Sequence, residues 1–566
     1  MAGGMLDIAV SGLMAFQRSI ETTSHNIANV NTEGYSRQRV ELDARLPTYT
    51  GGGYVGSGVD ITNIARSYDQ FTIGQLRSST SAFGEVDSFR SFAGQVDTLL
   101  ADPSTGMEPA LDGFFKAAND VANDPASITA RNVMLSEAEG LSYRFSLVSG
   151  RFEEMRDQVN SDVKSMTETI SSYTQAIADL NKDISTALGK ANGQQQPNDL
   201  LDERDLVLNK LSELVDISVI PQASGMVSVV MSNGQPLVMD AQAYKLGTQG
   251  NEFDPTKLEI TLIAEDTKPQ VITNQLTGGK LSGTLRFRDE ILDPAQQKLG
   301  SIANAIAMEF NAVHQQGYDL NGDLGEPFFK YTGINDVPAL SVTTNTGTST
   351  LTAAFGTNSG DLDTSDYLLK YDGANYTLTR MADDTVIPLT AAGSPAILTP
   401  TNATDALPGI TLEIDSTPNA DDQFFIRPSY RAADNLAVNV TDPRKIAAAE
   451  SLAPDGVTVM PGDNRNMLKM ADLMNKSSMF GSSTTFQEAY AQVVSKVGGL
   501  THSANINATA QESLLEKATE ARENISGVNL DEEAANLIKF QQAYQAAAQS
   551  ISTASSLFDS LIGAVS

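Results

Sequence analysis

Sequence motifs that could bind a metal are sparse. The best candidate is the run Asp319-Leu320-Asn321-Gly322-Asp323, which begins like a calcium-binding loop. Such a loop needs glycine at its sixth position and glutamate at its twelfth, where this chain has Leu324 and Lys330. We therefore interpret the run as a turn and expect no metal and no cofactor.

Catalytic motifs are equally sparse. The three histidines, His25, His314 and His502, lack the spacing of metal ligands and are interpreted as structural. The sequence contains neither a Gly-x-Ser-x-Gly elbow nor a His-Glu-x-x-His motif. With 70 Asp and Glu residues, no carboxylate pair can be singled out as acid and base. We predict that the protein is not an enzyme.

A glycine cluster could in principle cradle a phosphate. Its members are Gly51, Gly52, Gly53, Gly56 and Gly58. The cluster does not open a helix after a buried strand and lacks a Gly-Lys-Ser/Thr ending, so we expect a hinge or an extended hairpin.

Composition excludes two classes of partner. The 38 Lys and Arg against 70 Asp and Glu give a net charge of -32 with no basic cluster, so we expect no nucleic acid. No stretch approaches the roughly 20 apolar residues of a membrane span, so we expect no membrane partner. The first ten residues lack a basic region and Asp7 interrupts their apolar run, so we expect no cleaved secretory signal.

The elements that stand out are apolar stripes at the two ends of the chain. Their seven-residue spacing returns each side chain to nearly the same helix face, which predicts a seam for another helix. We expect the termini to pair with each other or with copies of themselves, the alternative being two amphipathic helices on the rim of a globular domain. The predicted assembly interface comprises Leu6, Leu13, Phe16, Ile20, Ile27, Leu530, Leu537, Phe540, Tyr544, Ile551, Phe558 and Leu561.

The start of the C-terminal helix is well marked. Asn529 can cap it, and Glu532 stands at the capping-box position. Asp531 and Glu533 add negative charge near the positive end of the helix dipole.

The clearest periodic element runs from Ala138 to Leu188. In the first part of this element each residue of the main apolar row is accompanied by an apolar residue three positions later, and in the second part by one four positions later. We call these the companion row. A seven-residue stripe drifts about 20° per heptad around a straight helix, and this change brings the stripe back to the same face. We expect a nearly straight rod rather than the core helix of an enzyme. Its main row consists of Ala138, Phe145, Phe152, Val159, Met166, Tyr173 and Leu180.

Two internal blocks have the period of β-strands. The first runs from Asp216 to about Leu285 and contains an Asn233-Gly234 hairpin turn. The second runs from about Pro338 to Pro428, is rich in Thr, Ser, Asn and Gly, and contains an Asp372-Gly373 turn. The chain then returns to helix, including a segment from Phe486 to Ala521 that we expect to break near Gly498-Gly499.

Helices at both ends with β modules between them predict an α+β multidomain chain that runs out and back. The terminal helices should pair as a coiled coil beside a long-helix bundle with inserted antiparallel β domains. The expected domains are 1–75 with 525–566 for the terminal coiled coil, 76–215 with 285–337 and 432–524 for the helical bundle, 216–284 for an inserted β domain, and 338–431 for an outer β-rich surface domain.

Short runs near both ends form a set of signatures. They are Ser11-Gly12-Leu13, Asn26-Ile27-Ala28-Asn29, Asn31-Thr32-Glu33-Gly34-Tyr35 and Gln541-Gln542-Ala543-Tyr544. Together they resemble the bacterial flagellar rod, hook and hook-associated family of axial proteins. Within that family Ser36-Arg37-Gln38, Ser526 to Glu533, Phe114 to Arg131 and Phe310 to Phe329 resemble the first hook-associated proteins, whereas the block from Pro338 to Pro428 matches no family motif.

The resemblance implies a structural axial protein that joins the flagellar hook to the filament by self-assembly. It implies terminal helices that are disordered in the free subunit and line the inner tube after assembly. The implied partners are copies of the chain in a ring, the hook protein, the next hook-associated protein on the filament side, the flagellar type III export apparatus and an export chaperone at the C-terminal helix. The implied location is extracellular, at the hook–filament junction. A hook or distal-rod protein, or an outer β module with adhesive or enzymatic activity, is the alternative.

Overall fold

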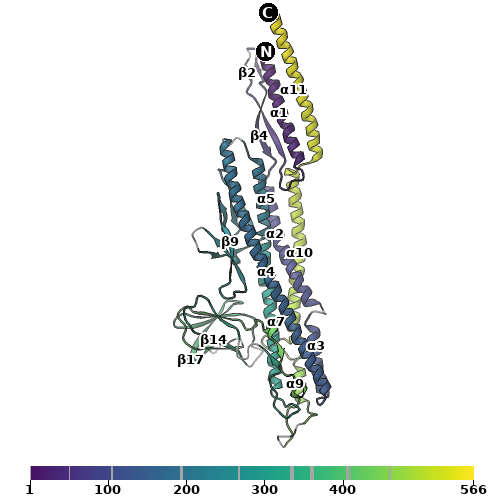
Figure 1. Cartoon of the computed structure of the whole chain (residues 1–566), viewed down its shortest axis with the longest axis vertical. Coiled ribbons are helices and arrows are strands. Elements are labelled where there is room, and N and C mark those ends of the chain that lie inside the picture. The colour runs from purple at the N-terminus through teal and green to yellow at the C-terminus, as the bar shows by residue number, and fades with distance from the viewer. Residues whose placement is uncertain are drawn as a thin grey trace.

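The computed structural model describes residues 2–49, 51–102, 106–191, 195–264, 268–331, 337–356, 362–402, 407, 409–454, 456, 458 and 460–565. The molecule is elongated (Figure 1). The two terminal helices lie together at one end, a bundle of long helices forms the body, and β-sheets project from one side of that body. Among the described residues, no helix is long and apolar enough to cross a membrane.

The body is dominated by the long helix that the sequence predicts. It is α4, Ile128–Lys190, and begins at Ser127, whose side chain accepts a hydrogen bond from the Ala130 N–H. Both predicted apolar rows of α4 face the core, with Met166 and Tyr173 of the main row and Met155 of the companion row only partly buried. The other helices of the body are α2 (Gln70–Ala101), α3 (Glu108–Asn123), α5 (Asn198–Leu214), α6 (Gly279–Phe287), α7 (Asp293–His314), α8 (Ala432–Asn435), α9 (Arg465–Asp472) and α10 (Phe486–Ser526).

Phenylalanines from separate segments close the core at one end of the body. Phe114, Phe310, Phe328 and Phe329 are fully buried, and their ring centroids lie 4.8 to 6.2 Å apart. Asn311 fixes the approach of this segment, because its side chain accepts from the Phe329 N–H at 2.8 Å and donates to the Phe329 carbonyl at 2.9 Å. The short strand β12 (Phe329–Lys330) then pairs with β21 (Ala437–Val438). This cluster joins the parts of the bundle that are distant in sequence.

The break that we predicted in the last helix of the body is absent. α10 runs unbroken through Gly498 and Gly499, where we expected a break. The helix packs along α2, and this packing outweighs the low helix propensity of the two glycines.

The first β block is shorter than predicted. Its strands are β5 (Ile217–Pro221), β6 (Val227–Met231), β7 (Pro236–Met239), β8 (Gln242–Ala243), β9 (Lys245–Gly250), β10 (Leu258–Ile263) and β11 (Gln270–Val271). The Asn233-Gly234 turn joins β6 to β7 as expected. The strand pattern does not continue to Leu285, because residues 279–287 form α6. Leu281 and Leu285 have the four-residue spacing of one helix face and are buried in the core to which α2 also contributes.

The second block forms a rolled antiparallel sheet. Among the described residues its strands are β13 (Ala339–Ser341), β14 (Leu351–Phe355), β15 (Tyr367–Tyr371), β16 (Tyr376–Arg380), β17 (Thr385–Gly393), β18 (Ala396–Pro400), β19 (Ile410–Ile414) and β20 (Gln423–Ile426). Their order is β13-β20-β15-β16-β17-β18-β19-β14, and a bridge between Val337 and Ala353 brings the two ends of the sheet together. The Asp372-Gly373 turn joins β15 to β16. The ends of this block lie side by side, with the Arg427 N–H donating to the Pro338 carbonyl at 2.9 Å.

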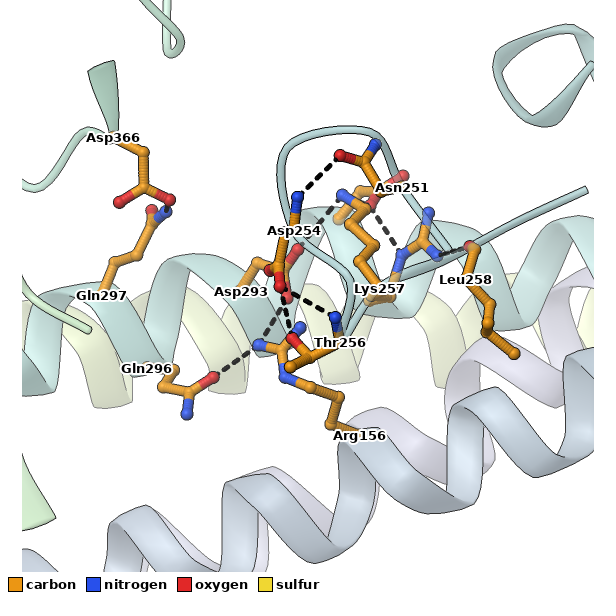
Figure 2. Close-up of polar contacts among 12 residues, drawn as sticks. Arg156, Asn251, Asp254, Thr256, Lys257, Leu258, Asp293, Gln296, Gln297 and Asp366 are labelled. Carbon is orange, nitrogen blue, oxygen red and sulfur yellow. Dashed lines mark hydrogen bonds and ion pairs between the residues drawn. The ribbon is translucent and has the colours of Figure 1, made fainter. Parts of the chain in front are cut away.

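Polar contacts hold the rolled sheet against the body. Arg427 pairs with Asp254 of the β9–β10 loop at 3.1 Å. Asp366, at the start of β15, accepts from Gln297 of α7 at 3.2 Å, and burial raises the pKa of Asp366 to about 6. Figure 2 shows Gln297 directed at Asp366, and Arg156 of α4 directed at the start of α7. These groups line a cavity of about 570 Å³ between the sheet, the β9–β10 loop and α7.

Candidate assembly interface

The two terminal helices pack against each other. They are α1, Ala2–Ala28, and α11, Leu530–Val565, and they lie side by side in Figure 1. α11 begins as predicted, because the Asn529 side chain accepts from the N–H groups of Asp531 at 2.9 Å and Glu532 at 3.3 Å. The pairing of the two ends within one chain is thus a property of this structure.

The predicted interface residues are mostly half-buried in the single chain. Leu13, Phe16, Ile20, Ile27, Leu537, Phe540, Tyr544 and Ile551 are partly covered, whereas Leu6, Leu530 and Phe558 are exposed. The side chain of Leu561 lies outside the described residues. The apolar side chains that are most completely buried on the two helices are small, namely Ala9, Ala15 and Ala554.

A groove of about 520 Å³ runs between the two helices. Its walls include Ala9, Gly12 and Phe16 of α1 together with Ala543 and Ala547 of α11. Small side chains let the helix backbones approach closely but leave little apolar surface buried between them. Apolar faces of both helices therefore remain available for other chains.

A β-ribbon flanks α1. It consists of β1 (Gln38–Ala44) paired with β4 (Val59–Arg66), and β2 (Thr48–Tyr49) paired with β3 (Tyr54–Val55) at its tip. The glycine cluster lies in this tip and in the return to β4, as the hairpin prediction required. Ser11 ties the ribbon to α1, since its hydroxyl donates to the Ile8 carbonyl at 2.9 Å and accepts from the Val59 N–H at 3.2 Å.

A buried polar cluster joins α1, α11 and the start of β1. We call it the terminal knot, and it consists of Asn26, Tyr35, Arg37, Gln38 and Glu533. The amide oxygen of Asn26 accepts from the Tyr35 hydroxyl at 2.7 Å and from the Gln38 N–H at 3.0 Å. Its amide nitrogen donates to the Gln38 carbonyl at 2.9 Å and to Glu533 at 3.0 Å. Asn26 is 1% exposed, and its hydrogen-bonding capacity is fully used.

Two ion pairs of Arg37 also belong to the terminal knot. The Arg37 guanidinium lies 2.9 Å from Glu533, which is 2% exposed, and 2.8 Å from Glu532, which is exposed. Glu532 therefore pairs with Arg37, an interaction that the capping-box prediction did not anticipate. Burial, together with Asp199, Asp202 and Glu533, raises the pKa of Tyr35 far above its usual range, so its hydroxyl keeps the proton that it donates.

The knot is anchored to the helical body. The Ser36 N–H donates to Asp202 of α5 at 2.9 Å, and Arg66 of β4 pairs with the same Asp202 at 2.9 Å. The Arg37 N–H donates to the Ser526 carbonyl at the end of α10 at 2.8 Å. Gly34 has a φ of +81°, and a Cβ there would lie 3.0 Å from Leu206 Cβ, so the turn before the knot requires glycine.

Sequence reasoning did not assign the knot as a site. Asn26, Gly34, Tyr35, Arg37 and Gln38 entered only as family signatures, and Glu533 only as a helix-dipole residue. The missed signal is that Glu533 follows Leu530 by three residues, on the apolar face at the start of the last helix, and that Asn26 stands in the last turn of the first helix. Polar residues at such positions are buried only when they satisfy one another.

The residues first considered for chemistry have structural roles. The Asp319 carboxylate accepts from the N–H groups of Asn321 at 2.7 Å and Asp323 at 3.0 Å, which is the turn predicted for this run. His314 is buried, with Nε2 accepting from the Ala447 N–H at 3.0 Å and Nδ1 donating to the Glu326 carbonyl at 2.7 Å. Burial lowers the pKa of His314 to about 4, so the ring is neutral at pH 7.

Comparison with known proteins identifies the family. The family described as Flagellar hook-associated protein FlgK helical domain matches residues 93–329. The chain is 32% identical over 560 residues to Flagellar hook-associated protein 1 of Salmonella typhimurium, covering 99% of each chain. The chain belongs to the flagellar hook-associated protein 1 family. The resemblance inferred from the terminal signatures is thereby confirmed.

Other similarities extend over the remaining chain. Flagellar hook-associated protein 1 of Bacillus subtilis is 24% identical over 591 residues, covering 98% of this chain and 97% of the relative. The flagellar hook junction protein FlgK from Burkholderia pseudomallei has a similar structure, with a TM-score of 0.71, 27% identity and coverage of 80% of this chain and all of that one. The Flagella basal body rod protein family matches 6–35, and the Flagellar basal body rod FlgEFG protein C-terminal family matches 522–564. The Flagellar hook-associated protein 1, D2-like domain family matches residues 340–428, the block in which we found no family motif.

Proposed function

We propose that this chain is a structural protein of the flagellum that joins the hook to the filament. The full-length relation to flagellar hook-associated protein 1, together with a structural relative described as a hook junction protein, carries this proposal. The paired terminal helices and their half-buried apolar faces supply a physical means of assembly, because those faces gain free energy when further copies cover them. No catalytic role is proposed.

The proposed partners follow from a position between the hook and the filament. Copies of the chain form a ring, which contacts the hook protein on one side and the next hook-associated protein on the other. The predicted interface residues from Leu6 to Ile27 and from Leu530 to Leu561 form the contacts between copies. Export proceeds through the flagellar type III apparatus without signal cleavage, and an export chaperone holds the C-terminal helix before export.

The domain division proposed from the sequence gives each part a place in this assembly. Segments 1–75 and 525–566 form the inner coiled coil, and 76–215, 285–337 and 432–524 form the surrounding helical bundle. Segments 216–284 and 338–431 lie outside them, except that α6, which begins at Gly279, packs against α2 in the bundle. The rolled sheet between 339 and 426, and the D2-like match over 340–428, support the outermost part.

Electron microscopy of cells lacking this chain tests the proposal. A junction protein predicts hooks without filaments, with filament subunits released into the medium. Restoration of filaments by the wild-type chain is the control. Normal filaments in the cells lacking it would overturn the proposal.

A further inference from the structure

Glu533 is a buried carboxylate that the apolar seam does not explain. It lies in the first turn of α11, between neighbours that are exposed to solvent, yet it is itself 2% exposed. Burying a carboxylate costs free energy unless it is paired and hydrogen-bonded. Here the Arg37 guanidinium and the Asn26 amide provide those partners at 2.9 and 3.0 Å.

The partners of Glu533 belong to segments that are already fixed. The other polar positions of Asn26 are occupied by Tyr35 and Gln38, and the Arg37 backbone is held by Ser526. Sliding α11 by one turn along α1 would move Glu533 by about 5.4 Å and leave Asn26 and Arg37 without it. The knot therefore accepts α11 in one register.

The apolar seam is less selective. The groove between the helices is lined on the α11 side by Ala543, Ala546, Ala547 and Ser550, which are small and similar in shape. A face of small residues gains nearly the same contact area after a slide, whereas one buried polar position discriminates between registers. Register selection consequently falls to the knot.

We propose that Glu533 is a positioning residue that sets the register of α11 on α1 and ties the start of the paired terminal helices to the helical body. This inference rests on the proposed junction function, because correct register matters where identical subunits must present identical apolar faces. Once paired, the helices have their exposed stripes aligned to the body through Arg37, Ser36 and Asp202. Glu532, which meets the same Arg37 from the solvent side, has no such role.

The test compares full-length variants in cells that lack the chromosomal copy. Glu533→Ala, Glu533→Gln and the control Glu532→Ala are scored for filaments per cell, for chain secreted into the medium, and for thermal unfolding of the purified chain. Glu533→Ala should reduce filaments at least about tenfold, because it removes the buried carboxylate that Arg37 and Asn26 share and leaves one N–H of the Asn26 amide without its acceptor. Secretion and the unfolding temperature of the body should stay near wild type. Glu533→Gln, which keeps an acceptor oxygen for Asn26, should restore part of the loss. Glu532→Ala should match wild type.

The outcomes separate this inference from the proposed function. If the wild-type chain fails to restore filaments, the junction function is wrong. If wild type restores them and Glu533→Ala does so equally, the positioning role is wrong. An equal loss in Glu532→Ala, or an unfolding temperature that falls in Glu533→Ala in proportion to the filament loss, would also overturn it.

Discussion

Single side chains in this protein hold together segments that lie far apart in sequence. Asn26 uses both acceptor and both donor positions of one amide to bind the Tyr35–Gln38 turn and Glu533, 507 residues away. Asn311 binds both the N–H and the carbonyl of Phe329 with its side-chain amide, and His314 binds the carbonyl of Glu326 and the N–H of Ala447 with its two ring nitrogens. Each such group is costly to remove, because its partners are left buried and unsatisfied.

His314 makes a prediction about pH. Its pKa falls from about 6.5 in the unfolded chain to about 4 in the fold, so the neutral ring stabilises the protein above pH 6.5, and that stability is lost as the pH falls through 6.5 toward 4. At pH 5 the loss should be about 2 kcal/mol. Thermal unfolding of wild type and His314→Gln should show that the advantage of wild type shrinks between pH 7 and pH 5. A constant gap between wild type and His314→Gln would contradict the prediction.

For single residues, the sequence predicted contacts between near neighbours in the chain but not contacts between distant residues. The Asp319 turn followed from local spacing, because its hydrogen bonds lie within four residues. The knot could not be derived in the same way, since Glu533 meets Asn26 only after the two ends of the chain come together.

At the scale of elements, the periodic rows determine how helices pack. The rows of α4 face the core as predicted, since seven-residue spacing specifies a helix face directly. α6 and the unbroken α10 were not predicted, because glycines near both segments indicate turns in the sequence. Their helical state depends instead on packing against α2. Local propensity was overruled where tertiary contact was strong.

Gly283 tests this packing of α6 on α2. A Cβ at Gly283 would lie 2.0 Å from the Glu85 carbonyl oxygen, so Gly283→Ala should force the helices apart and destabilise the protein by at least about 2 kcal/mol. Gly140 of α4 has open space, so Gly140→Ala should be neutral or stabilising by about 0.5–1 kcal/mol. Calorimetry of both variants measures the difference. Equal unfolding temperatures of the two variants would show that the close packing of α6 on α2 does not contribute to the stability of the fold.

The terminal seam predicts an assembly defect. Leu537 and Ile551 are half-buried on α11, and an aspartate at either position would have to lose its hydration without a partner when other copies cover the helix. Leu537→Asp and Ile551→Asp should be secreted but should not be incorporated, as counted by filaments per cell. Gln541→Asp, at an exposed position of the same helix, is the matched control. Wild-type filament numbers in the two seam variants would refute the pairing of the stripes as the means of assembly.

At the scale of the whole molecule, the parts proposed to assemble and the outer sheet lie apart. The paired termini lie at one end and the rolled sheet projects from the side of the body (Figure 1). The net charge of -32 keeps free copies mutually repelling, so assembly depends on specific contacts rather than on general attraction. The order of helical and β periods along the sequence predicted this nested architecture, whereas the rolling of the outer sheet depends on the bridge between Val337 and Ala353, which no local pattern reveals.

The outer sheet should be dispensable for joining hook to filament. Its ends meet at Pro338 and Arg427, so a short Gly-Ser bridge can replace the block without moving the body. Cells carrying this replacement should build filaments and swim, as measured by filament counts and motility in soft agar. A Gly-Ser insertion at the Asp372-Gly373 turn, which leaves the sheet in place, is the control. Filament loss despite normal export of the shortened chain would mean that the block carries assembly contacts.

We propose that the paired terminal helices, positioned by the terminal knot, build the join between hook and filament. An electron cryo-microscopy map of the intact hook–filament junction would show whether they do. We expect a ring of this chain between hook and filament, with α1 and α11 paired at the innermost radius and the rolled sheet at the outermost. A map with this chain absent from the junction, or with α1 and α11 separated or on the outside, would contradict it.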